Sequence, residues 1–77
     1  MKCTILHETR GRMRVRLCCR CMTLEQADVL EYYLRAVDGV QSATVYDRTR
    51  DAVVLYEAER GNIIRALAQF SFAKAEA

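Results

Sequence analysis

Three thiols lie within four positions of this 77-residue chain, at Cys18, Cys19 and Cys21. Thiolates are soft ligands that suit Cu(I), Zn(II) or Cd(II), and two of them on one tight loop can share an ion. Cys18 and Cys21 have Cys-x-x-Cys spacing, but a fully extended strand would place them on opposite faces. They converge only if the strand ends near Cys18 and the chain curls. Cys18 with Cys21 is therefore the candidate metal pair, and Cys19 is a third candidate ligand.

The same cysteines also have a purely structural interpretation. Cys19 and Cys21 share a parity, so both can pack inward as small hydrophobic side chains. In that case the chain binds no metal and needs no cofactor. Neither Cys3 nor His7, the single histidine, is expected to be a ligand.

Positive charge surrounds the thiols. Arg16 and Arg20 flank them, and a predicted helix begins just after Cys21. Both the arginines and the helix dipole favour the thiolate form. At least one of the three thiols is therefore expected to be unusually reactive.

Arginines alternate with apolar residues just before the cysteines. Residues 12–17 read Arg-Met-Arg-Val-Arg-Leu, which predicts a strand with one apolar face and one arginine face. A solvated face whose charges discourage edge pairing is one explanation. A docking surface for an anionic partner is the other.

Capping residues and periodicity predict the helices. Thr23 and Gln26 form a capping box, and apolar residues at helical spacing predict a helix from about Leu24 to Val37. Gly39 can end it in the left-handed conformation. A second helix is expected from a cap at residue 62 to about residue 69.

Strands are expected at residues 3–8, 41–46, 52–57 and 70–72. A turn or bulge at 9–11 leaves open whether residues 3–18 form one interrupted strand or two. The order strand, helix, strand, strand, helix, strand is the ferredoxin-like βαββαβ arrangement. We therefore expect an α+β fold in which two helices cover one face of a four-stranded antiparallel sheet.

Strand parity predicts what lies on each side of this sheet. The expected core residues are Leu17, Leu30, Leu34, Val45, Val54, Ile64 and Leu67. Arg14, Arg16, Val53 and Leu55 are expected together on the face away from the helices, as the candidate docking surface. Tyr46 is the only aromatic residue expected near that face, whereas Tyr56 should point inward.

Residues 1–77 are expected to form a single domain, with 73–77 as a frayed end or a linker. No apolar run approaches the roughly 20 residues of a membrane span. No signal peptide is visible, so a cytoplasmic location with reduced thiols is expected. The net charge of +2 is weak evidence about partners.

One family resemblance emerges from these segments. Residues 36–40, Ala-Val-Asp-Gly-Val, followed by strand 41–46, a polar hairpin and strand 52–56, resemble the heavy-metal-associated domain. Residues 7–17, with their Gly-Arg-x-Arg start, look like the divergent branch of that family. The resemblance covers most of the chain. It implies a domain on the cytosolic side of a heavy-metal-transporting P-type ATPase, whose cytosolic domains would be the partner, in cis or in trans.

One departure from the family concerns its metal loop, Met-x-Cys-x-x-Cys. The family's second cysteine lies some thirteen residues before the Gly-Val, and the same count back from Gly39 gives Gln26, with Thr23 at the first cysteine position. The capping box thus replaces the usual pair, while Cys18 and Cys21 lie about five residues upstream. The resemblance implies either a soft-metal site at these junction cysteines or a metal-free docking domain.

Two other functions fit the sequence less well. Ferredoxin-like sheets bind single-stranded nucleic acid by stacking bases on aromatic residues, and Tyr46 alone would serve here, so nucleic acid is not an expected partner.

Acylphosphatase-like enzymes of this fold use an arginine and an asparagine at a phosphate cradle. Asn62 is the only asparagine, and no matching glycine-rich loop precedes the first helix. His7 has no evident nucleophile to activate, so we expect no enzymatic activity.

Overall fold

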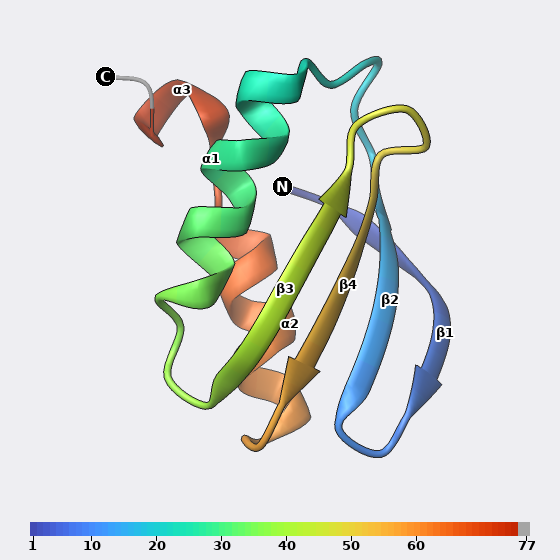
Figure 1. The fold of residues 1–77 in the computed structure, drawn as a ribbon, viewed down its shortest axis with the longest axis vertical. Coiled ribbons are helices and arrows are strands. Elements are labelled where there is room, and N and C mark those ends of the chain that lie inside the picture. Colours follow the sequence, from blue (N-terminus) through green and yellow to red (C-terminus); the bar gives the residue numbers. More distant parts are fainter. Residues whose placement is uncertain (76–77) are drawn as a thin grey trace.

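Four strands and two main helices make up the chain in a computed structural model that describes residues 1–75 (Figure 1). The elements are β1 (Cys3–Thr9), β2 (Arg12–Leu17), α1 (Leu24–Arg35), β3 (Val40–Tyr46), β4 (Asp51–Tyr56), α2 (Arg60–Gln69) and the short α3 (Phe72–Ala75). The strands form one antiparallel sheet in the order β1-β2-β4-β3, and both helices pack on the same face of it. The fold is therefore α+β and ferredoxin-like, as predicted. Within residues 1–75, no helix is long and apolar enough to cross a membrane.

The fourth strand comes from the beginning of the chain, not from its end. Gly11 has a φ of +82° and closes a hairpin, so the segment before the cysteines forms two strands, β1 and β2. β1 occupies the sheet edge where the βαββαβ arrangement would place its last strand, and the observed order is ββαββα.

The predicted strand at 70–72 is wrong. Phe70 is buried against the rings of Tyr33 and Phe72, and Phe72 begins α3. The apolar alternation of this segment therefore reflects aromatic packing near α1 rather than strand pairing. The expected frayed end is helical as far as Ala75, and residues 76–77 lie outside the described part of the chain.

The start of α1 is as predicted. The Gln26 N–H donates to Thr23 Oγ1 at 3.1 Å, and the Thr23 N–H donates to Gln26 Oε1 at 3.0 Å, which completes the capping box. The helix ends at Arg35, two residues earlier than expected. Gly39 has a φ of +88°, and a Cβ there would lie 2.5 Å from the Ala58 Cβ, so this turn requires glycine.

The core lies between the sheet and the two helices. Its fully buried members include Met13, Val15, Leu17, Leu30, Leu34, Val54, Ile63 and Leu67. Ile63 is fully buried, whereas the predicted Ile64 is only half-buried at the margin of the core. α2 also begins earlier than predicted, at Arg60 behind Glu59 rather than behind Asn62. Ile63 and Leu67, four residues apart, share the inward stripe.

The outer edge of β3 is closed by two side chains of α1. Glu31 accepts a hydrogen bond from the Val45 N–H at 2.8 Å, and Arg35 Nη2 donates to the Ala43 carbonyl at 3.2 Å. Glu31 and Arg35 also form an ion pair one helical turn apart. These contacts occupy backbone groups that a further strand would need, so this edge is protected against pairing.

Replacing Leu34 by alanine should lower the free energy of unfolding by about 2–5 kcal/mol, because the side chain is fully buried and its loss leaves a cavity. Urea denaturation measures this change. Tyr32→Ala, on the 80% exposed neighbour, is the control and should change stability by less than about 0.5 kcal/mol. An equally small effect of Leu34→Ala would contradict the packing of α1.

Candidate functional site

Two central strands build the sheet face that points away from the helices, which we call the open face. Its residues are Arg12, Arg14 and Arg16 of β2 and Asp51, Val53 and Leu55 of β4. Arg12 lies opposite Leu55, Arg14 opposite Val53, and Arg16 opposite Asp51. The predicted grouping of Arg14, Arg16, Val53 and Leu55 on one face is therefore confirmed. Their role in docking stays a prediction.

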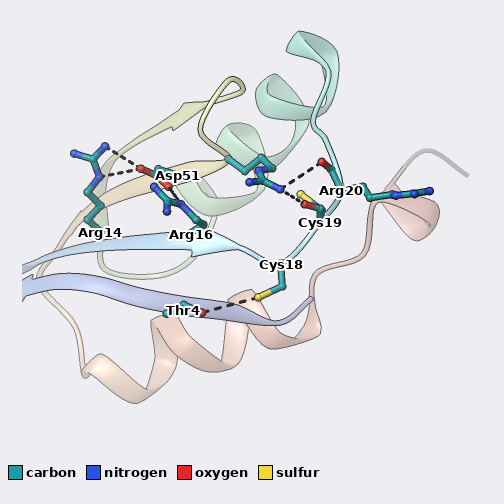
Figure 2. A network of polar contacts seen from close by, with 8 residues as sticks. Thr4, Arg14, Arg16, Cys18, Cys19, Arg20 and Asp51 are labelled. Atoms are coloured by element: carbon teal, nitrogen blue, oxygen red, sulfur yellow. Dashed lines mark hydrogen bonds and ion pairs between the residues drawn. The ribbon is translucent and has the colours of Figure 1, made fainter.

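Asp51 lies at the centre of an ion cluster on this face (Figure 2). Arg14 Nε and Nη2 donate to its Oδ2 at 3.2 and 2.9 Å, and Arg16 Nε donates to its Oδ1 at 2.9 Å. The Asp51 side chain is only 1% exposed, whereas Arg14 and Arg16 are 40% and 47% exposed. One buried carboxylate thus orients two guanidinium groups that remain in contact with solvent.

Two opposing effects act on the pKa of Asp51. Burial by itself would raise it, but hydrogen bonds from Arg16 and Arg14 and their positive charges outweigh burial. The pKa of Asp51 is therefore lowered from its usual value, and the carboxylate stays ionised at neutral pH.

Sequence reasoning missed Asp51 because it placed this residue in the polar hairpin loop. β4 begins one residue earlier than predicted. The signal was strand parity, since Asp51 precedes Val53 by two positions and so shares its face.

Tyr46 extends the open face onto β3. It pairs with Asp51 across the strands, and the Arg14 guanidinium lies 5.9 Å from the centre of its ring. This is a cation–π contact. Tyr46 is exposed and Tyr56 is buried in the core, so both predicted orientations are confirmed.

Residues 18–22, which we call the cysteine segment, join β2 to α1. The chain bends where β2 ends, and the Cys19 N–H donates to the Leu17 carbonyl at 3.0 Å. Cys18 and Cys21 are exposed, and Cys19 is half-buried against the core. The expected inward packing is therefore confirmed for Cys19 and wrong for Cys21. The strand has ended, so parity no longer decides where Cys21 points.

The three thiols do not converge. Cys18 Sγ lies 4.0 Å from Thr4 Oγ1 of β1, and Figure 2 shows the sulfur atoms of Cys18 and Cys19 on opposite sides of the segment. Among residues 1–75, no group of three or more His, Cys, Asp or Glu side chains is placed to hold a metal ion. Cys19 is thus not brought into a three-ligand group, and the two-thiol pair of Cys18 and Cys21 stays a prediction.

The Arg50 side chain holds the cysteine segment by binding two backbone carbonyls of that segment. Its Nη1 donates to the carbonyls of Cys19 and Arg20 at 2.6 and 3.3 Å, and the Arg50 carbonyl accepts from the Leu17 N–H at 2.8 Å. Burial raises the pKa of the Cys19 thiol, and the nearby Arg50 charge only partly opposes it. Of the three thiols, Cys19 is therefore not the one expected to be unusually reactive.

Cys3 also lies near this segment, because it pairs with Leu17 next to Cys18. Burial raises the pKa of the Cys3 thiol, and the adjacent Cys18 thiol raises it further. This thiol is therefore mostly protonated at neutral pH in the absence of a metal ion, and the expectation that Cys3 is not a ligand stays a prediction.

Comparison with known proteins found no family model, no curated protein and no solved structure that matches this chain.

Replacing Asp51 by asparagine should lower the free energy of unfolding at neutral pH by about 1–3 kcal/mol, because it removes the charge that holds both arginines. The pKa of Asp51 in the folded state lies below the unfolded value of about 3.9. The stabilisation is therefore present above about pH 4 and is lost as the pH falls through the folded-state pKa.

Urea denaturation of the wild type and Asp51→Asn at about pH 7, 5 and 3 tests this. The stability difference should be similar at the two higher values and smaller at the lowest. A difference that is independent of pH would contradict the ionised cluster.

Proposed function

We propose that this chain is a regulatory docking module of a heavy-metal-transporting P-type ATPase, located in the cytoplasm and acting through its open face. The observation that carries the proposal is the arginine pair that Asp51 orients beside Val53 and Leu55. Additional support comes from the resemblance to the heavy-metal-associated domain, which implies this fold and this partner. The module itself has no catalytic role.

The open face combines two properties that favour protein association. Arg14 and Arg16 are already oriented by Asp51, so less side-chain freedom is lost when a partner binds. Val53 and Leu55 supply apolar surface next to these charges, and Leu55 is partly exposed. Arginine is one of the residue types enriched among those that contribute most at interfaces.

The docking test titrates the full chain with the purified cytosolic domains of such a pump by calorimetry. Leu55→Glu should weaken binding about tenfold or more, because it places a charge in the apolar part of the open face. Leu24→Glu is the matched control, since Leu24 is also exposed but lies on α1. Its affinity should equal that of the wild type.

Charge reversal at Arg14 or Arg16 is a poorer test, because it would put a second acid beside the buried Asp51 and destabilise the fold. Docking through this face would be contradicted if Leu55→Glu bound as tightly as the wild type. It would also be contradicted if Leu55→Glu and Leu24→Glu weakened binding equally.

Soft-metal binding is a second candidate, favoured by the exposure of both Cys18 and Cys21 on a bent segment. Zn(II) and Cd(II) sites of the structural type use four ligands, and residues 1–75 contain no such group. A pair of thiolates suits Cu(I) better, because soft sulfur ligands select it. Cys18 and Cys21 would then hold the ion, and the chain would deliver it to the pump or sense it.

Calorimetric titration of the reduced protein with Cu(I) and Zn(II) tests this candidate. Cys18→Ser and Cys21→Ser should each abolish Cu(I) binding, and Cys19→Ser should retain it, since Cys19 packs toward the core. Binding should weaken from neutral pH to about pH 5, because protons compete for the thiolates. The absence of stoichiometric binding to reduced protein would leave a metal-free docking module.

A further inference from the structure

The chemistry of the open face defines the kind of partner it accepts. We infer that it recognises carboxylate side chains on an acidic, partly apolar protein segment, and this inference rests on the proposed docking function. Among residues 1–75, three guanidinium groups, those of Arg12, Arg14 and Arg16, lie on this face with a single carboxylate, Asp51. The surplus charge is positive, so it attracts an anionic partner.

The arginines keep donors for that partner. Arg14 uses Nε and Nη2 for Asp51, and Arg16 uses only Nε. Within residues 1–75, Nη1 of Arg14 and both terminal nitrogens of Arg16 have no hydrogen-bond partner, and both side chains are close to half exposed. The terminal nitrogens of Arg16 form the planar fork that binds a carboxylate through two parallel hydrogen bonds.

Asp51 prepares these donors without cancelling their charge. It is buried beneath the two arginines, so an approaching carboxylate meets the guanidinium groups first. Because the arginines are already held in place, an incoming acid orders fewer rotamers on binding. Asp51 therefore acts as a positioning residue for recognition.

Three other partners fit the open face less well than an acidic protein segment does: a second copy of the chain, single-stranded nucleic acid and a membrane surface. A second copy of the chain would bring the same arginines against themselves, and like charges disfavour that contact. Single-stranded nucleic acid needs several aromatic platforms, whereas Tyr46 is the only aromatic side chain on the described open face, and Arg14 already contacts its ring. Membrane binding needs apolar side chains that insert into the bilayer, whereas Val53 is half-buried and Leu55 is only 37% exposed on this face. A protein segment supplies both carboxylates and apolar side chains.

The test uses a short synthetic peptide of glutamate, leucine and glycine, titrated into the isotope-labelled full chain and followed by NMR. Amide shifts should cluster on β2 and β4, and affinity should fall as salt is raised. The same peptide with glutamine in place of glutamate should bind at least about tenfold more weakly. An oligothymidine and anionic phosphatidylglycerol vesicles, which carry phosphate but no carboxylate, are the competing probes.

Three variants locate the recognition. Arg12→Glu should weaken peptide binding about tenfold without disturbing the ion cluster, because Arg12 makes no contact with Asp51. The double variant Arg16→Gln with Asp51→Asn removes both ends of one ion pair, so no buried charge is left alone, and it should also weaken binding. Arg65→Glu on the exposed side of α2 is the matched control and should bind like the wild type.

The inference is overturned if the glutamine peptide binds as well as the glutamate peptide, if Arg65→Glu weakens binding as much as Arg12→Glu, or if oligothymidine or vesicles bind in preference. Docking of the pump domains on the open face without any binding of the glutamate peptide would refute carboxylate recognition and leave the proposed function standing. If pump domains bind elsewhere while the glutamate peptide binds the open face, the proposed function fails and the recognition chemistry stands.

Discussion

The pairing of β2 with β4 at the centre of the sheet is the constraint on which both faces of this domain depend. Arg12–Leu17 and Asp51–Leu55 run antiparallel, and alternate side chains of each strand point to opposite faces. Met13, Val15 and Leu17 therefore enter the core opposite Ala52 and Val54. A shift of this register by one residue would bury the arginines and expose the core, so the core and the open face are specified together.

The open face is tied to the stability of the fold through Asp51. A carboxylate that is 1% exposed needs partners, and Arg14 and Arg16 supply them while keeping donors for solvent. The surface proposed to bind a partner thus contains an ion cluster that also contributes to folding. A variant that leaves this cluster intact therefore separates an effect on binding from an effect on folding.

The two candidate functions lie side by side. Cys18 contacts Thr4, and Thr4 pairs with Arg16 across β1 and β2. Arg50 fixes the backbone of the same segment from the turn between β3 and β4. An ion held at Cys18 would therefore place charge next to the arginines of the open face. In this arrangement, the two proposed activities would take place next to each other on one surface.

The sequence by itself determined the features that depend on local periodicity and capping. Alternation predicted that Arg14, Arg16, Val53 and Leu55 share a face, and the capping box predicted where α1 begins. Both are confirmed, because the capping box and the alternation within each strand need only neighbouring residues, while the pairing of β2 with β4 brings the two halves of the face together. Tertiary structure alone decided the rest, because those features depend on contacts between segments distant in the chain. β1 fills the edge expected for residues 70–72, the start of β4 buries Asp51 under two arginines, and Arg50 holds the segment in which Cys19 turns inward and Cys21 outward.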